Sequence, residues 1–288
     1  MGIAMCPPLS VLAILLAIAP GDAAVGAAES APRVKCVAHR GFSAVAPENT
    51  LAAVRKAIEA GADGCEFDVR ASKDGVVVLM HDRTVDRTTN AEGKVGEFTA
   101  AQLQQMDAGS WKGEAYAGEP VPTLVQVLRA MKGKGCTAVV EVKQDGIARP
   151  VADAIRTTGM QGETVIISFS DRALADVHAL APTVPCALLV GGEMKGTVAE
   201  WAAHLAERAA KCGATILDLN HEMLSPELVA ALRGRGFAVW CWTVNDAERM
   251  KTLAHWGVEA VTTDRPDILA GRRARDGQNV NGCTTVSE

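Results

Sequence analysis

The sequence predicts a single TIM-type (β/α)8 barrel of the α/β class, and three observations support this prediction. Eight short runs rich in Val, Ile and Leu alternate with helical patterns, as expected of parallel strands buried on both faces. The chain has 288 residues, which suits a barrel of about 250 residues. No Gly-x-Gly-x-x-Gly pattern follows the first run, which argues against an open dinucleotide-binding sheet. The predicted strands are 34–39, 64–69, 138–143, 164–168, 186–190, 215–219, 237–242 and 259–263.

Residues that commonly cap helices mark five helices between these strands. Asn, Thr or Ser precedes each predicted helix, and Gly follows four of the five, where an αL residue would end a helix. Pro226 stands at a first-turn position, which helices tolerate. The predicted helices are 51–60, 124–132, 171–180, 227–233 and 246–256.

The connection between the second strand and the helix at 124 is unusually long. It contains the turn signal Lys73-Asp74-Gly75, a short extra strand at 76–80, and then a polar stretch up to Pro122. Long insertions in barrels usually lie at the catalytic face. We therefore predict a small inserted subdomain at about 81–120, after strand two.

Both ends of the chain differ from the barrel region. Residues 9–19 form an apolar run, followed by Pro20 and a small-residue stretch, as in a secretory signal peptide, although no Lys or Arg precedes the run. We expect a signal peptide at 1–28, a barrel at 33–272 and a C-terminal tail at 273–288. The protein would then be periplasmic or secreted, with no stable membrane span after processing. An uncleaved anchor or a plain extension is the alternative.

Charge and cysteine usage exclude some functions. The formal net charge is -5 and no run of Lys and Arg occurs, so no nucleic-acid partner is expected. None of the eight cysteines forms a Cys-x-x-Cys pair, which argues against zinc. Cys36, Cys65 and Cys241 fall inside apolar runs and read as buried hydrophobic residues. A disulfide between two of the others stays open, as does the oligomeric state.

Acidic residues interrupt two of the apolar strands. Glu66 and Asp68 are two positions apart, so both side chains point to one side, about 7 Å apart. Glu141 and Lys143 repeat this spacing on another strand. Buried acids are costly unless they are paired or bind a cation, and all-oxygen ligands favour a hard divalent ion. The alternative is an ion-pair network in which Arg40 and Lys143 neutralise the acids.

Two histidines each close an apolar strand and open a loop. These are His39, which is followed by Arg40 and Gly41, and His81, which is followed by Asp82. Either residue alone would more often be a packed histidine. Beside a metal-carboxylate cluster, however, two histidines suit the hydrolysis of a phosphate ester, in which one takes a proton and the other donates one.

Taken in order, these motifs resemble the glycerophosphodiester phosphodiesterase family from about residue 34 to 270. Two small departures are Cys65, where an aliphatic residue is usual, and Ser170, where Asp is frequent. Neither removes a catalytic group. The motifs are VAHRG (37–41), PENT (47–50), GADGCEFDVR (61–70), KDG (73–75), HD (81–82), DRTT (86–89), DAGSW (107–111), GEPVPTL (118–124), EVK (141–143), WTVN (242–245) and TDRP (263–266).

The resemblance implies a role for several side chains. His39 and His81 would be the general acid/base pair, and Arg40 would contact phosphate. Lys143 would assist phosphate binding or orient the carboxylates. Trp242 would line the pocket, where glycerol or the alcohol could pack.

The resemblance also implies a cofactor and a substrate. Glu66, Asp68 and Glu141 would bind one divalent cation, Mg²⁺ or Ca²⁺, with Mn²⁺ as a further option. The expected reaction converts a small-molecule glycerophosphodiester to glycerol 3-phosphate and an alcohol, through attack by water or by the neighbouring glycerol hydroxyl. A lysophospholipase D-like activity on lysolipids is the main alternative. A non-catalytic barrel scaffold or a sugar-metabolising barrel fits the residues less well.

Overall fold

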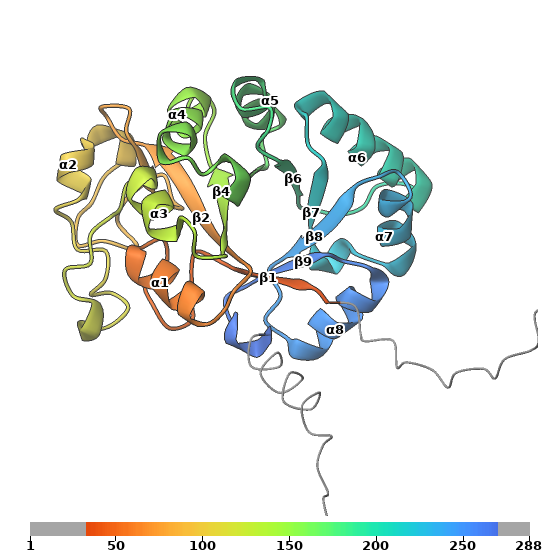
Figure 1. Ribbon diagram of the computed structural model, residues 1–288, viewed down its shortest axis with the longest axis horizontal. Helices are drawn as coiled ribbons and strands as arrows, with labels where there is room; N and C mark the ends of the chain where they lie inside the picture. Colours follow the sequence, from red (N-terminus) through yellow and green to blue (C-terminus); the bar gives the residue numbers. More distant parts are fainter. Residues whose placement is uncertain (1–32, 270–288) are drawn as a thin grey trace, which may run out of the picture. The chain divides into compact units, whose positions relative to one another are not determined.

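The computed structural model describes residues 33–269, and these form a closed barrel of eight parallel strands (Figure 1). The strands follow the order β1-β2-β4-β5-β6-β7-β8-β9, and β9 pairs with β1 to close the ring. Helices surround the strands, so the predicted TIM barrel is confirmed. The strands are β1 (Lys35–Ala38), β2 (Gly64–Ala71), β4 (Thr137–Val142), β5 (Thr164–Ser168), β6 (Cys186–Val190), β7 (Ile216–Asn220), β8 (Ala238–Trp242) and β9 (Ala260–Thr263).

The outer helices include the five that were predicted and two that were not. The helix α4 (Ala148–Thr158) begins after Ile147, which makes no side-chain cap, so the sequence carried no start signal there. The helix α6 (Val198–Cys212) does begin with a capping box formed by Thr197 and Glu200, a signal that was present but not used. The others are α1 (Leu51–Glu59), α3 (Leu124–Met131), α5 (Asp171–Leu180), α7 (Pro226–Arg233) and α8 (Ala247–Trp256).

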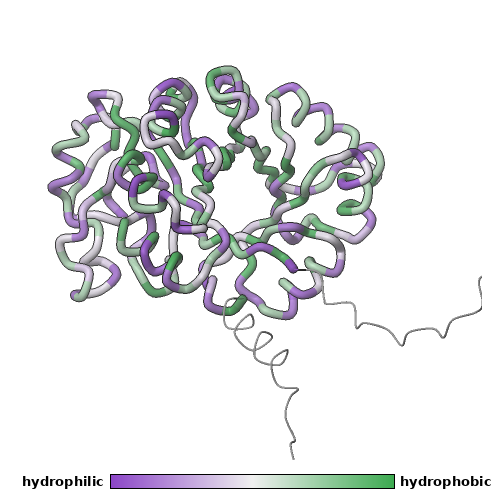
Figure 2. Tube along the Cα trace, in the orientation of Figure 1, coloured by the Kyte–Doolittle hydropathy of each residue, from purple (hydrophilic) through white to green (hydrophobic). Residues whose placement is uncertain are grey.

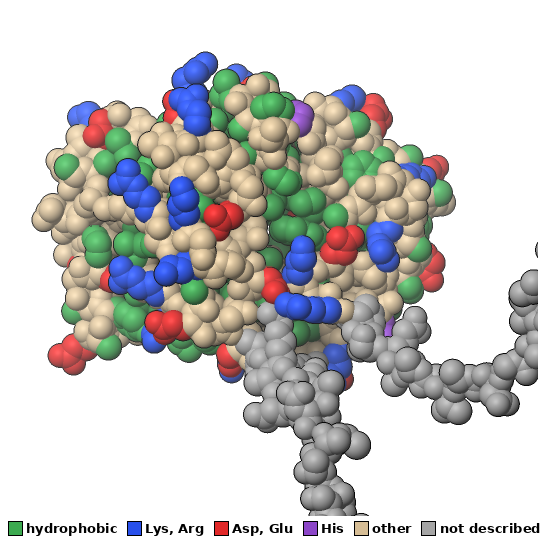
Figure 3. All heavy atoms as spheres, in the orientation of Figure 1, with side chains coloured by type: hydrophobic (Ala, Val, Ile, Leu, Met, Phe, Trp, Pro, Cys, Tyr) green, Lys and Arg blue, Asp and Glu red, His purple; other side chains and the backbone are tan. Residues whose placement is uncertain are grey.

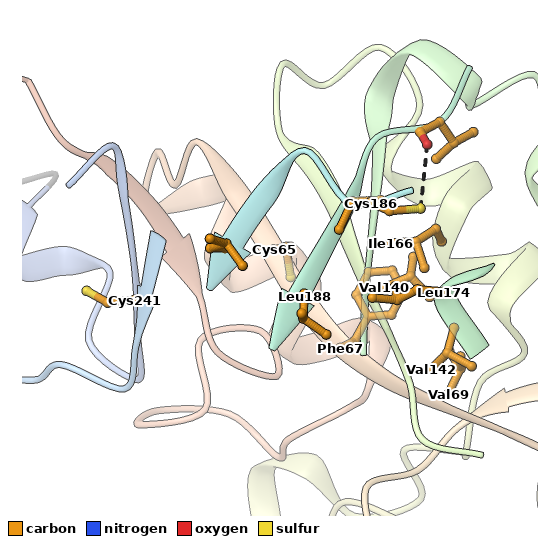
Figure 4. Close-up of a cluster of buried hydrophobic side chains, with 14 of the residues drawn as sticks. Cys65, Phe67, Val69, Val140, Val142, Ile166, Leu174, Cys186, Leu188 and Cys241 are labelled. Atoms are coloured by element: carbon orange, nitrogen blue, oxygen red, sulfur yellow. Dashed lines mark hydrogen bonds between the residues drawn. The ribbon is translucent and has the colours of Figure 1, made fainter. Parts of the chain in front are cut away.

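Alternate side chains of each strand pack on opposite sides of the barrel wall. The outward side chains meet the helices in the main hydrophobic core; Figure 4 shows Phe67, Val140 and Leu188 of this layer together. The inward side chains form a smaller apolar cluster that includes Val139, Ile167 and other strand residues. The strands are accordingly the most hydrophobic part of the trace in Figure 2. Apolar side chains therefore fill one end of the barrel interior, and the polar residues gather at the other end.

The segment between β2 and α3 forms its own small layer. It starts with β3 (Val77–Leu79), which pairs antiparallel with β2, and continues through η1 (Val95–Glu97), α2 (Ala100–Leu103) and η2 (Glu114–Tyr116). Its apolar side chains form a separate cluster. Contacts with the loop after β1 anchor the segment. Lys112 Nζ donates to the Ser43 carbonyl at 2.6 Å, and Tyr116 Oη donates to the Val45 carbonyl at 2.9 Å.

Within residues 33–269, all six cysteines are buried and none forms a disulfide. This agrees with their interpretation as buried hydrophobic residues. No helix in the same part of the chain has the length and apolar character needed to cross a membrane. The predicted signal peptide, 1–28, and the whole of the predicted tail, 273–288, lie outside the described residues.

Candidate active site

Three carboxylates converge at the polar end of the barrel. Glu66 and Asp68 lie on β2 and Glu141 lies on β4, where Asp68 and Glu141 are register partners. Each of the three offers an oxygen atom, and these atoms lie within 4.8 Å of one another. The close approach follows from the sequence, because residues i and i+2 of a strand share a face and the neighbouring strand lies beside them.

Two cations neutralise this cluster only in part. Lys143 Nζ lies 2.7 Å from Glu141 Oε1 and 3.4 Å from Asp68 Oδ1, and Arg40 Nε lies 3.5 Å from Asp68 Oδ2. Glu66 receives only a hydrogen bond from the Arg40 backbone N–H, at 2.8 Å. The ion-pair network that we considered as an alternative is therefore present, but it leaves three carboxylates facing two cations.

Two buried oxygens test whether a metal ion fits this cluster. Glu66 Oε1 and Asp68 Oδ1 are inaccessible and accept no hydrogen bond from any described residue, and the nearest cation to Asp68 Oδ1 is Lys143 Nζ at 3.4 Å. A buried carboxylate oxygen without a donor is costly, and a divalent cation would satisfy both atoms at once. The three carboxylates thus fit a hard cation better than a closed ion-pair network.

Burial and crowding shift the titration of these acids. Burial, followed by repulsion from Asp68 and Glu141, raises the pKa of Glu66 well above its ordinary value. Burial and the charge of Asp68 raise the pKa of Glu141 to about 7. Burial also disfavours ionisation of Asp68, but Lys143 and Arg40 outweigh it and lower its pKa. Asp68 is therefore the acid best held in the charged form by the protein itself.

His39 is oriented by a carboxylate from the last strand. Its Nδ1 lies 2.7 Å from Asp264 Oδ1, and Asp264 also accepts hydrogen bonds from Ser43 at 3.0 Å and Asn245 at 2.7 Å. Burial opposes ionisation of Asp264, yet the hydrogen bonds from His39 and Asn245 hold its pKa well below the ordinary range. Asp264 therefore stays charged and fixes Nδ1, which leaves Nε2 as the free ring nitrogen.

His81 has a similar partner one residue away. Its Nδ1 lies 2.6 Å from Asp82 Oδ1, and Arg87 Nε donates to Asp82 Oδ2 at 2.6 Å. Burial is the main cause that lowers the pKa of His81, despite the opposing effect of Asp68. Both histidines are thus held through Nδ1 by an aspartate, from two different parts of the chain.

The loop after β1 places Arg40 through an unusual backbone. Arg40 and Asn49 have positive φ values of 54° and 58°. Gly41 also has a positive φ, and a Cβ atom there would lie 2.5 Å from the Cβ of Ala53, so only glycine fits. Asn49 in turn donates to Asp68 Oδ2 at 2.9 Å and accepts from the Asp68 backbone N–H at 2.9 Å. The loop thereby orients a cluster acid as well as Arg40.

Glu48 links the two histidine loops. It accepts a hydrogen bond from Arg40 Nη1 at 2.9 Å and two hydrogen bonds from Arg87, at 2.8 Å and 2.9 Å. Arg87 also holds Asp82, the partner of His81. Glu48 thereby supports Arg40 directly and His81 through Arg87 and Asp82.

A cavity of about 140 Å³ brings these groups together. Its polar wall includes His39, His81 and the acids Glu66 and Glu141, while Trp242 and Phe169 contribute an apolar side. The Trp242 and Phe169 rings pack edge to face with centroids 5.4 Å apart. Arg40 and Lys143 also line this cavity, and Asp68 lies beside it, paired by charge with Arg40 and Lys143. Every predicted site residue therefore falls in or directly beside one cavity.

Some residues of the site had no assigned role in the sequence. Asp264 and Asp82 stood in quoted motifs, but only the fold shows that they contact the histidines. Asp218 was missed entirely. It is 1% exposed, lines the cavity from β7, and burial raises its pKa well above the ordinary value. A single acid inside an apolar strand was the available signal.

A barrel with clustered carboxylates, two aspartate-held histidines and two cations at its polar end defines a class of enzyme. The cluster suits a divalent cation, the histidines suit proton transfer, and the cations suit a phosphate group. The class is therefore that of barrel enzymes that act on phosphate esters.

The chain belongs to the glycerophosphoryl diester phosphodiesterase family, which matches residues 39–268. A glycerophosphodiester phosphodiesterase of Caldanaerobacter subterraneus subsp. tengcongensis is 38% identical over 238 residues, covering 81% of this chain and 95% of that protein. A Bacillus subtilis glycerophosphodiester phosphodiesterase is 33% identical over 258 residues, covering 83% and 86%. The resemblance inferred from the motifs is confirmed, and so is the prediction of a phosphodiesterase.

Solved structures show the same fold. The crystal structure of a glycerophosphodiester phosphodiesterase from Agrobacterium tumefaciens superimposes with a TM-score of 0.73 at 32% identity, covering 83% of this chain and 100% of that one. A phosphodiesterase of Oleispira antarctica, in complex with the product sn-glycerol-3-phosphate, superimposes with a TM-score of 0.74 at 29% identity, covering 84% and 96%.

Proposed function

We propose that this protein hydrolyses glycerophosphodiesters to glycerol 3-phosphate and an alcohol, with a divalent cation and two histidines. One observation carries the proposal: buried carboxylate oxygens of Glu66 and Asp68 lack hydrogen-bond donors beside a cavity lined by His39 and His81. The Oleispira antarctica relative, which holds sn-glycerol-3-phosphate, supports the same product.

Glu66, Asp68 and Glu141 would hold the cation, and Mg²⁺, Ca²⁺ and Mn²⁺ suit their all-oxygen ligand set. When bound, the cation supplies positive charge that stabilises the phosphoryl oxygens and acidifies a bound hydroxyl. The protein's own contribution is to keep these acids in place without enough internal cations to satisfy them.

His39 and His81 would carry the protons of the reaction. With Nδ1 bonded to Asp264 or Asp82, each ring presents Nε2 for proton exchange. One histidine would take the proton of the attacking hydroxyl, and the other would donate a proton to the departing alcohol oxygen. The aspartates would stabilise each ring while it is protonated.

Arg40 and Lys143 would bind the phosphate. Both line the cavity beside the acids, and each carries several N–H donors that suit phosphate oxygens. Trp242, backed by Phe169, would offer an apolar face to the carbon atoms of glycerol. These contacts would fix the phosphorus atom between the two histidines.

A lysophospholipase D-like activity remains the second candidate, because one observation favours it. Phe169 is 46% exposed at the cavity and stands against Trp242, so an acyl chain could lie over this apolar edge.

The test is turnover of glycerophosphocholine by the purified protein, with glycerol 3-phosphate read by a coupled dehydrogenase. We expect product formation in Mg²⁺ or Ca²⁺ and its loss in EDTA, with recovery after the ion is restored. Lysophosphatidylcholine, assayed in parallel for choline release, separates the second candidate. Absence of product from any glycerophosphodiester, in folded protein supplied with metal, would refute the proposal.

A further inference from the structure

A second and larger depression opens beside the catalytic cavity. It has a volume of about 760 Å³, and we call it the side groove. It shares Glu141, Lys143 and Phe169 with the catalytic cavity, so the two adjoin each other. From there it runs past the end of β2 to the inserted segment. A molecule bound in the catalytic cavity could therefore extend one of its substituents into the side groove.

The walls of the side groove carry four cationic side chains. Arg70 comes from β2, Lys143 follows β4, and Arg83 and Lys94 come from the inserted segment. Figure 3 shows Lys and Arg side chains gathered on the side of the molecule where β2, β4 and the inserted segment lie. This concentration is unexpected in a chain whose net charge is -5.

The acids along the side groove compensate this charge only in part. Glu97 reaches the ammonium of Lys94 at 4.0 Å, Asp145 accepts the hydroxyl hydrogen of Ser170 at 2.6 Å, and Glu141 belongs to the metal cluster. Arg83 is exposed and makes no ion pair with any described residue. Part of the groove thus presents unpaired positive charge.

Hydrogen bonds hold Arg70 in a fixed position in the wall of the side groove. Its Nε and Nη2 donate to the His81 carbonyl at 3.0 Å and 2.7 Å. Arg70 and Arg83 both line the side groove, and two guanidinium groups in one groove are a favourable environment for an anion.

The aromatic residues of the site also favour an anionic substituent over a cationic one. A quaternary ammonium group such as choline binds best to a free aromatic face. Lys143 Nζ already lies 6.0 Å from the centroid of the Phe169 ring, which disfavours a second cation there. The side groove therefore suits an anionic substituent better than a cationic one.

We propose that the side groove binds an anionic group, a phosphate or carboxylate, on the alcohol half of the substrate. This inference rests on the proposed function, since it concerns the alcohol that leaves during hydrolysis. Arg83 and Lys94 are the specificity-determining residues, and the preferred glycerophosphodiesters are those whose alcohol carries an additional negative charge.

Two substrates that differ by one phosphate test this inference. The full chain with Mg²⁺ is assayed on glycerophosphoinositol and on glycerophosphoinositol 4-phosphate, and kcat/KM is compared. We expect a preference of roughly 10-fold for the phosphorylated substrate, the size expected of two partly exposed ionic contacts. The preference should shrink as NaCl rises, because salt screens such contacts.

A matched pair of variants locates the effect. Arg83→Gln combined with Lys94→Gln should reduce the preference to near unity. Arg129→Gln combined with Lys134→Gln removes the same charge from exposed positions around the end of α3, outside the side groove, and should retain it.

Equal kcat/KM values for the two substrates in the wild type would overturn the inference, and so would a preference that survives in the Arg83→Gln, Lys94→Gln variant. Turnover of glycerophosphocholine by the same protein would still uphold the proposed function. A preference lost equally in the control variant would also overturn it. Failure to hydrolyse every glycerophosphodiester would instead refute the proposed function, and the inference with it.

Discussion

Two neighbouring strands of the barrel place opposite kinds of side chain, one charged and one apolar, at the same level of the interior. Glu141 on β4 and Ile167 on β5 are register partners, and both side chains face the interior. Ile167 packs in the apolar cluster, and burial of such a side chain stabilises the fold by about 1.5–3 kcal/mol. Glu141 is nearly as buried, at 9% exposed, yet burial raises its pKa and so opposes its charge. One strand stabilises the barrel, whereas the other places a buried carboxylate at the cavity at a cost in stability.

The largest expected effect concerns the histidines on the functional side of the barrel. His39→Ala and His81→Ala should each lower kcat by about 10²- to 10⁴-fold, because each removes one proton-transfer group. Thermal unfolding should change little, since both side chains are partly exposed. A steady-state assay and a melting curve measure the two quantities. Variants with nearly wild-type kcat would show that the chemistry lies elsewhere.

A smaller effect separates the two register partners directly. Ile167→Ala should lower the free energy of unfolding by about 2–5 kcal/mol, because it leaves a cavity in the interior. Glu141→Gln should leave the stability of the metal-free protein unchanged or higher, while kcat falls by at least about 10²-fold. Denaturant unfolding in EDTA and turnover in Mg²⁺ provide both numbers. Equal losses of stability in the two variants would contradict the comparison.

The smallest expected effect is a pH dependence of stability. The folded, metal-free protein keeps the proton of Glu141 up to a pH of about 7, whereas the unfolded chain releases it near 4.5. The unfolded state therefore binds fewer protons between these values, and this group makes stability fall as pH rises from about 5 to 7. Glu141→Gln should remove this contribution, which is of the order of 1–3 kcal/mol. Identical pH profiles for the wild type and the variant, in EDTA, would exclude it.

The barrel could be read from the sequence because its strands are buried on both faces. Apolar runs and capping residues located every strand and five of the outer helices. The helix α4 was not predicted because Ile147 offers no side-chain cap. Packing against neighbouring helices stabilises α4 instead. Local signals located the other five helices; the capping box at Thr197 also marked α6 but was not used, and α4 depends on tertiary contacts.

The site could be predicted in its residues but not in its supporting contacts. Spacing by two on a strand placed Glu66 and Asp68 together, and this relation is local. Asp264 lies 225 residues from His39, so their hydrogen bond depends on closure of the barrel. Asp218 gave only a weak signal, a single acid in an apolar strand. The roles of these residues and the predicted leader and tail stay predictions.

The most direct test of the central claim is metal binding by the carboxylate cluster itself. Protein stripped with EDTA is titrated with Mn²⁺ in a calorimeter, and the thermal midpoint is recorded with and without the ion. We predict one site per chain and a higher midpoint with metal in the wild type, and loss of both in Glu66→Gln. No binding by the folded wild-type protein, or unchanged binding by Glu66→Gln, would contradict the account.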